Sequence, residues 1–275
     1  MNKTRRKFLK VTGMSMPALM IHPGRTRFSS NATDFQLGIA SYSLRNYTLD
    51  KTIEITRRLG IPNLALKSMH MPLEMTDAEI KGVKKKINDA GLNLYGAGVI
   101  YMNTEEEVKN AFRYAQAADL KVIIGVPKYE LIDMVEELVK STGIKVAIHN
   151  HGPGDDVYPS PESVYEKVKN RDPRIGLCMD IGHTERIGLD PAAEAKKYFP
   201  RLLDVHLKDV DKSTAEGDTV EIGRGVINIP AFLKVLKDRN YEGIVSFEYE
   251  KDPDDILPGL SESIGYARGV IAALQ

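Results

Sequence analysis

Cysteine is almost absent from this chain of 275 residues, which contains only Cys178. A single cysteine excludes disulfide bonds within the chain. Cys178 lies in the apolar run IGLCMD, and we expect it to be a small core residue rather than a nucleophile.

Excess charge of one sign is also absent. Lys and Arg together number 38, as do Asp and Glu, so the formal net charge is zero. Proteins that bind nucleic acids usually carry a basic excess or a basic stripe, and none follows residue 30. We therefore expect no nucleic-acid partner. A hydrophobic fraction of 42% predicts a folded globular protein with a sizeable core.

No hydrophobic run is long enough to span a membrane. The apolar stretch from Val11 to Ile21 is too short and contains Gly13 and Pro17. A basic segment precedes it, and its letters TRRKFLK resemble the twin-arginine export signal. No lipobox cysteine and no clean Ala-x-Ala cleavage site follow. We expect residues 1–33 to be this signal, with a disordered basic tail as the alternative.

Export by this route predicts a periplasmic protein that keeps no stable membrane anchor. The twin-arginine route carries folded proteins, which suits an enzyme that acquires its cofactor before it leaves the cytoplasm.

The rest of the chain, residues 34–275, alternates short apolar runs with longer segments of helical period. The runs predict eight strands, at residues 35–42, 61–67, 92–99, 120–126, 144–150, 174–180, 202–208 and 243–249. The segments between and after them predict eight helices, at residues 49–59, 77–90, 105–118, 129–141, 161–169, 191–199, 229–239 and 261–274.

This pattern predicts an α/β fold, a single (β/α)8 TIM barrel. Nearly continuous apolar strands are typical of a parallel sheet that helices cover. The alternative is an open, doubly wound sheet. Such a sheet normally has a glycine-rich nucleotide turn after its first strand, and SYSLRN at residues 41–46 is not such a turn.

Histidine is scarce, yet its distribution is uneven. The chain has six histidines, and five of them fall at the carboxyl ends of predicted strands. Active sites of (β/α)8 barrels lie at these ends. The polar residues found there are Lys67, His70, His149, His151, Asp180, His183, His206, Lys208, Asp209, Glu248 and Glu250.

Four of these residues form a candidate metal site: His149, Asp180, His206 and Glu248 each close a different strand, from the fifth to the eighth. Neighbouring strands lie about 4.8 Å apart, so the four side chains can reach one ion. Two carboxylates balance a divalent cation, and a mixture of imidazole and carboxylate suits Mn, Fe, Co or Zn. We expect one divalent metal ion as the cofactor.

Several of these segments together resemble one family. VAIHNHG, CMDIGHT, DVHLKD and GRGVINIPAFLKVLKDRNYEGIVSFEYE occur in the order found in sugar phosphate isomerases/epimerases of the xylose isomerase-like TIM barrel superfamily, and the resemblance covers residues 35–274. The resemblance implies one divalent metal, most often Mn, with Zn, Co, Fe and Mg as alternatives. It implies that Asp180, His206 and Glu248 are ligands and that His183 contacts the substrate.

The fifth strand departs from the pattern of this family. Family epimerases have Glu-Asn-His where this chain has His149-Asn150-His151. In those enzymes the glutamates of the fifth and eighth strands move a proton on and off carbon, and a histidine bound to metal has no free carboxylate oxygen for that step. We expect metal binding to survive the change and two-glutamate epimerisation to be lost.

The remaining groups suit abstraction of a proton next to a carbonyl of a small carbohydrate substrate. Glu248 is the candidate base, and His151, His183 and Lys208 are further catalytic candidates. We expect Lys67, His70, Tyr42 and Arg224 to contact the substrate. One hypothesis is a lyase or hydrolase of 3-keto-glycosides, in which loss of the C2 proton expels the C1 substituent.

Two rival functions remain. A sugar-binding barrel without turnover is one, although the Asp180, His206 and Glu248 set argues against it. Repair of DNA, as by endonuclease IV in the same superfamily, is the other. The histidine of its third strand is missing from YGAGVIYMN, and DTVEIG stands in place of its Asp-x-His motif.

Overall fold

The computed structural model describes residues 35–274. The expected export signal at residues 1–33 therefore lies outside the described residues. Within residues 35–274, no helix combines the length and the apolar character needed to cross a bilayer.

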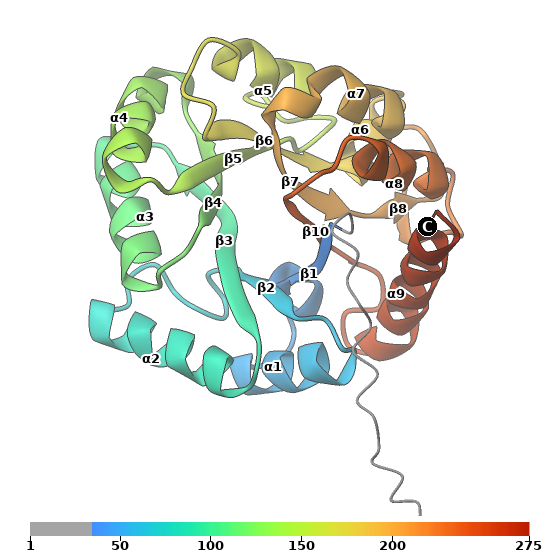
Figure 1. The fold of residues 1–275 in the computed structure, drawn as a ribbon, viewed down its shortest axis with the longest axis horizontal. Helices are drawn as coiled ribbons and strands as arrows, with labels where there is room; N and C mark the ends of the chain where they lie inside the picture. The colour runs from blue at the N-terminus through green and yellow to red at the C-terminus, as the bar shows by residue number, and fades with distance from the viewer. Residues whose placement is uncertain (1–34, 275) are drawn as a thin grey trace, which may run out of the picture. The chain divides into compact units, whose positions relative to one another are not determined.

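Eight parallel strands close into a barrel, which confirms the (β/α)8 prediction (Figure 1). Their order around the barrel is their order in the sequence, and the last strand, β10, pairs with both β7 and β1. They are β1 (Gln36–Ala40), β2 (Asn63–Leu66), β3 (Asn93–Met102), β4 (Val122–Pro127), β5 (Lys145–His149), β6 (Ile175–Asp180), β7 (Leu202–Leu207) and β10 (Ile244–Phe247).

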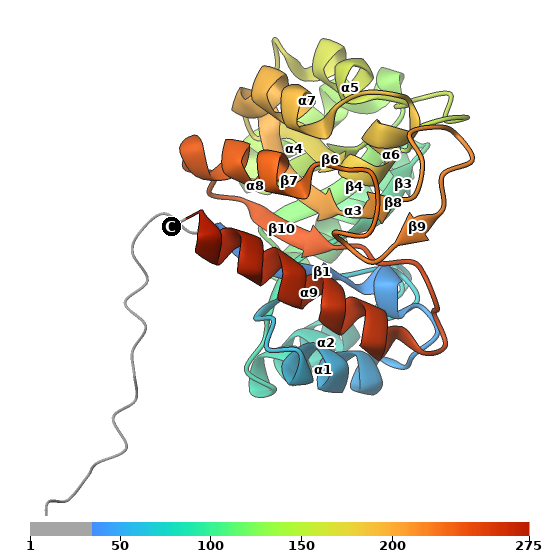
Figure 2. The same cartoon turned by 90° about the vertical axis from the view of Figure 1, so that its right-hand side faces the viewer.

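Helices surround the strands in an outer ring, as Figure 1 shows along the barrel and Figure 2 shows from the side. They are α1 (Leu49–Arg58), α2 (Asp77–Asp89), α3 (Glu105–Ala117), α4 (Ile132–Thr142), α5 (Pro161–Val168), α6 (Ile181–Arg186), α7 (Pro191–Tyr198), α8 (Ile229–Asp238) and α9 (Ile256–Ala273). Their apolar faces pack on the outside of the strands, where the largest buried cluster lies. A smaller cluster, which includes Tyr95 and Cys178, fills the barrel itself.

Local sequence signals account for where the helices begin. The Thr76 hydroxyl accepts a hydrogen bond from the Glu79 amide, and the Glu79 carboxylate accepts one from the Thr76 amide, so α2 begins with a capping box. Gly91 follows α2 with φ +77°, a conformation that favours glycine.

Four features differ from the prediction. The chain turns into a 3-10 helix at Ser41–Leu44 directly after β1, so Tyr42 does not lie on a strand. The short helix α6 follows β6 at once. The long loop after β7 contains a small antiparallel pair, β8 (Asp209–Val210) and β9 (Thr219–Val220). Helix α9 begins five residues earlier than residue 261, because Ile256 and Leu260 also face the core.

Candidate metal centre

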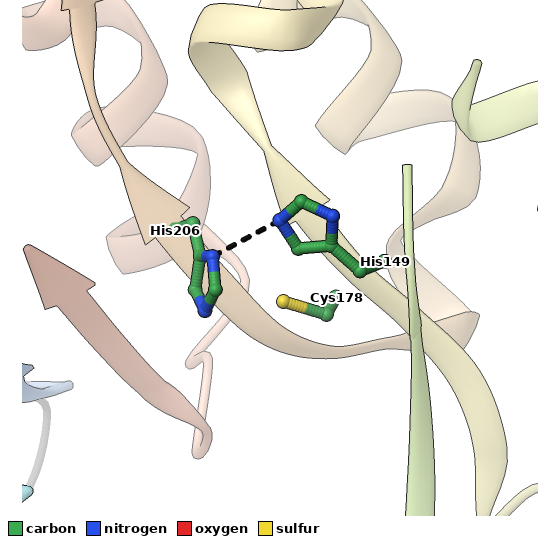
Figure 3. A group of neighbouring side chains, drawn as sticks. All are labelled: His149, Cys178 and His206. Atoms are coloured by element: carbon green, nitrogen blue, oxygen red, sulfur yellow. Dashed lines mark hydrogen bonds between the residues drawn. The ribbon is translucent and has the colours of Figure 1, made fainter. Parts of the chain in front are cut away.

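Four side chains from neighbouring strands converge at the carboxyl end of the barrel. His149, Asp180, His206 and Glu248 each offer one ligand atom, and these four atoms all lie within 4.8 Å of one another. Nε2 of His149 is 3.0 Å from Nδ1 of His206, which is 3.1 Å from Oε2 of Glu248. Figure 3 shows the two imidazoles facing each other from β5 and β7. The structure therefore brings the four expected residues together in one cluster.

The register of the barrel brings these residues together. Asp180 on β6 pairs with His206 on β7, and Glu248 directly follows β10. His149 is the last residue of β5. Asn150 then fixes the end of β6, because its Oδ1 accepts a hydrogen bond from the amide of Asp180 and its Nδ2 donates to the carbonyl of Asp180.

Asp180 has two separate functions in this geometry. Its Oδ1 accepts a hydrogen bond from the amide of His183 at 2.8 Å and so caps α6. Its Oδ2 faces the cluster, 3.6 Å from Nε2 of His149 and 3.0 Å from Nζ of Lys208. Capping fixes the carboxylate so that the second oxygen is held toward the other ligands.

Burial and the neighbouring charges keep three of the four groups, His149, Asp180 and Glu248, in the states that a metal requires. Burial lowers the pKa of His149 to about 4, so its imidazole is neutral and can donate a lone pair. Burial opposes ionisation of Asp180 and Glu248, but nearby cationic groups, Lys208 among them, outweigh it and hold both carboxyl pKa values well below their usual range. Burial lowers the pKa of His206, but the Glu248 carboxylate outweighs it and raises the pKa overall.

The residues present fit a divalent ion. All four are buried, and buried carboxylates are costly unless a cation compensates them. Oδ2 of Asp180 is inaccessible to solvent and accepts no well-formed hydrogen bond. Two imidazoles and two carboxylates form a donor set that suits Zn, Mn, Fe or Co.

Cys178 lies next to His149 and His206, inside the barrel (Figure 3). Burial raises the pKa of its thiol well above the usual value, so the thiol stays protonated. Because metals bind the thiolate, the set with two carboxylates is the better metal site. The structure places Cys178 in the apolar cluster of the barrel, as a core residue.

A cavity of about 290 Å³ opens directly onto this cluster. Its lining includes His149 and Glu248 from the cluster and the expected residues Tyr42, Lys67, His151 and His183; Val99, Tyr101 and Glu250 complete it. This volume is at the lower end of the range for small-molecule sites, which suits one sugar ring.

Tyr101 is a cavity residue that the sequence did not reveal. Its hydroxyl lies 3.1 Å from Nε2 of His151, and the two rings stack with their centroids 5.7 Å apart. On the other side of the imidazole, Nδ1 of His151 is 3.4 Å from Oδ2 of Asp155. His151 is thus held between Tyr101 and Asp155 at the wall of the cavity. Its ring centre is 4.5 Å from that of His149, but His151 is not one of the four clustered residues.

His183 and Lys67 lie where the sequence predicted, at the cavity. Burial lowers the pKa of His183 to about 4, so a neutral imidazole faces the cavity. Nζ of Lys67 donates a hydrogen bond to the carbonyl of Val99 at 3.0 Å and lies 5.8 Å from the centre of the Tyr42 ring. Burial also lowers the pKa of the Lys67 ammonium.

Lys208 lies next to the ligands rather than among the cavity-lining residues. Its Nζ contacts Asp180, Glu248 and Glu250, and its side chain is 1% exposed. The prediction that Lys208 is a catalytic residue therefore has no contact with the cavity to support it. Glu250 lines the cavity, and its Oε1 lies 2.5 Å from Nζ of Lys208.

His70 does not line the cavity, and the expected contact with substrate finds no support. Its Nδ1 lies 2.9 Å from the Ser41 hydroxyl, and its Nε2 lies 3.0 Å from the Tyr47 carbonyl and 3.1 Å from the Thr52 hydroxyl. With both ring nitrogens occupied inside the protein, His70 ties the β2–α2 connection to the start of α1.

We expect His70→Gln to reduce stability rather than catalysis. At pH 8, its free energy of unfolding should fall by about 1–3 kcal/mol, because buried hydroxyls lose their partner. Burial lowers the pKa of His70, so below pH ~6.5 the unfolded chain binds a proton that the folded protein does not. The difference between wild type and variant should therefore narrow in urea unfolding at pH 5.5. Unchanged stability with reduced kcat/KM would place His70 in substrate binding instead.

Arg224 also lies away from the cavity. Its guanidinium is largely exposed and forms an ion pair with Glu262 of α9. Arg224 follows Gly223, whose amide, like that of Gly225, donates a hydrogen bond to the carboxylate of Asp209. These amides therefore hold the loop to an internal carboxylate of the protein, and the expected contact between Arg224 and substrate finds no support.

Comparison with known proteins places this chain in one family. The model of the xylose isomerase-like TIM barrel family matches residues 53–269. The chain belongs to this family. It is 28% identical to the inosose dehydratase of Clostridium perfringens over 182 residues, 59% of this chain and 61% of that protein. It is 25% identical to the inosose isomerase of Halalkalibacterium halodurans over 241 residues, 75% of this chain and 84% of that protein.

Solved structures show the same fold. One of them is the crystal structure of the IolI protein, which holds a zinc atom. The structural match covers 87% of this chain and 98% of the IolI chain, with a TM-score of 0.72 and 18% sequence identity. The chain spans 61% of the length of the curated dehydratase that it matches. The family and the barrel are thereby established.

Proposed function

We propose that this family member is a metal-dependent enzyme that removes a proton from the carbon next to the carbonyl of a keto-sugar. Removal of this proton leads either to isomerisation of the sugar or to elimination of a neighbouring oxygen substituent. The observation that carries this proposal is the placement of the four-residue cluster against a cavity sized for one sugar ring. The relatives support it, because two of them are named for removal of water from inosose and for isomerisation of inosose.

The four ligands would be His149, Asp180, His206 and Glu248, with His149 in place of the glutamate that family epimerases have at this position. A bound divalent ion, for which we propose manganese with zinc as the main alternative, would polarise the carbonyl of the substrate and so acidify the adjacent C–H. The zinc atom bound in the IolI structure supports a metal in this chain as well.

Glu248 is the base that this geometry favours. It lines the cavity, and it is ionised because its pKa is held low. Its position next to the other ligands would place it beside the carbonyl that a bound ion polarises. With histidine at position 149, the opposite wall offers no second carboxylate from β5. Return of the proton to the other face of the carbon, which epimerisation needs, is therefore disfavoured relative to elimination.

The departing oxygen would meet His151, His183 and Tyr101. These groups line the cavity and carry N–H or O–H donors able to protonate or hydrogen-bond an alkoxide as it leaves. The proton lost from carbon and the proton gained by the leaving oxygen balance, so elimination needs no oxidant or reductant. We propose 3-keto-glycosides as the substrate class, for which this elimination releases the aglycone.

A direct assay tests this function. Protein loaded with Mn²⁺ or Zn²⁺ is incubated with 4-nitrophenyl 3-keto-glucoside, and release of nitrophenol is followed by absorbance. We expect release that chelation with EDTA abolishes and added metal restores. No release with either metal, from this substrate or from an alkyl 3-keto-glucoside, would refute the keto-glycoside substrate class.

Export remains part of the proposal. TRRKFLK at the start of the chain favours a periplasmic location, where breakdown of imported or external glycosides is a more natural task than metabolism of sugar phosphates. Fusion of residues 1–33 to a reporter, with Arg5 and Arg6 replaced by lysine as the control, tests this location.

A further inference from the structure

Lys208 is a buried ammonium that contacts three carboxylates. Nζ lies 3.0 Å from Oδ2 of Asp180, 3.1 Å from Oε2 of Glu248 and 2.5 Å from Oε1 of Glu250. The position is built for this side chain: at Gly182, a β-carbon would come within 2.7 Å of Cδ of Lys208. Glycine at 182 thus leaves room for the stem of Lys208 beneath α6.

Two of these contacts involve the same oxygens that face the metal site. Oδ2 of Asp180 also lies 3.6 Å from Nε2 of His149, and Oε2 of Glu248 also lies 3.1 Å from Nδ1 of His206. An ion bound among the four ligands would therefore share both carboxylate oxygens with the ammonium. The third partner, Glu250, is not one of the four.

The charge balance among Lys208, Glu250 and the two ligand carboxylates differs between the metal-free and the metal-bound site. With neutral imidazoles, Asp180 and Glu248 together balance a divalent ion, while Lys208 and Glu250 balance each other. Without the ion, Lys208 is the only cation in contact with both ligand carboxylates in the described part of the chain. With the ion, two cations lie close together in a buried site, where their repulsion is strong.

We propose that the Lys208–Glu250 pair sets the metal affinity of the centre. Lys208 holds the carboxylates in place before the ion arrives and weakens binding by repulsion, while Glu250 strengthens binding by neutralising the ammonium. The site is then preformed without metal, and the ion is exchangeable rather than permanently held. This inference rests on the metal site of the proposed function, but not on its substrate or reaction.

Variants of the two residues should change the affinity for Mn²⁺ in opposite directions. By calorimetric titration of metal-free protein with Mn²⁺, Lys208→Met should bind about tenfold or more tightly than wild type, because one positive charge next to the ion is gone. Glu250→Gln should bind more weakly by about three- to tenfold, because the ammonium is then less well neutralised. Lys251→Met is the matched control; Lys251 pairs with Glu221, 2.7 Å away, and its loss should leave the affinity within about twofold of wild type.

The results of these titrations distinguish a failure of the Lys208–Glu250 proposal from a failure of the metal site itself. Weaker or unchanged binding by Lys208→Met would overturn it, since Lys208 would then only position the carboxylates. Unchanged or tighter binding by Glu250→Gln would overturn it equally. If Lys208→Met folds only with Mn²⁺ present, the rate of Mn²⁺ release to a chelator replaces the titration, and release faster than wild type contradicts the inference. Failure of wild type to bind Mn²⁺ or Zn²⁺ would instead refute the metal site.

Discussion

Glu248→Gln is expected to lower kcat by about 10³-fold, within the range of 10²–10⁴-fold that loss of a positioned base costs. The amide keeps the shape of the side chain but cannot accept a proton from carbon. It also removes the negative charge that faces His206 and Lys208, each 3.1 Å away. The measurement is kcat on a keto-sugar substrate at saturating Mn²⁺, so that weaker metal binding does not obscure the chemical step.

An exposed glutamate supplies the control for this variant. Glu262 pairs with Arg224 on the outside of the barrel, and Glu262→Gln should leave kcat within about twofold of wild type. If fully metal-loaded Glu248→Gln retains wild-type kcat, Glu248 is only a ligand and the base lies elsewhere in the cavity.

The second large effect is expected at the two neighbouring histidines. His149→Ala should weaken metal binding by about 100-fold or more, because a direct ligand is lost where even an outer partner typically costs 10–100-fold. His151→Ala should keep the metal, because His151 contacts Tyr101 and lies beside Asp155 instead of joining the cluster. Metal content per chain after dialysis, measured by elemental analysis, distinguishes the two.

A second substitution at position 149 refines the result. His149→Glu should retain metal, since a carboxylate replaces an imidazole in the same place. Equal metal content in His149→Ala and wild type would show that β5 contributes no ligand, and the four-residue site would be wrong at that strand.

The fold and the four-residue cluster followed from the sequence because each depends on short-range pattern. Apolar runs of four to eight residues that alternate with helical segments predict the barrel, and parallel strands place all their carboxyl ends at one rim. His149, Asp180, His206 and Glu248 could therefore be brought together without knowledge of any loop.

The differences between the predicted site and the structure have physical causes that the sequence does not display. β3 continues to Met102 with a register shift between Ala97 and Ile100, so the alternation of side chains changes phase and Tyr101 enters the cavity. His70 has the polar character of a site residue, but its partners lie on the β1–α1 connection and α1. Arg224 finds its partner 38 residues further along the chain, a pairing that only the docking of α9 sets.

The most direct test of the central claim is exchange of hydrogen at the carbon next to the ketone, because it does not depend on which group leaves. A keto-sugar is incubated with the protein in deuterated water and followed by NMR. We predict that Mn²⁺-loaded protein incorporates deuterium at that carbon or in the product formed from it, and that EDTA or Glu248→Gln suppresses incorporation. Incorporation at an unchanged rate after removal of the metal would contradict metal-assisted deprotonation at this site.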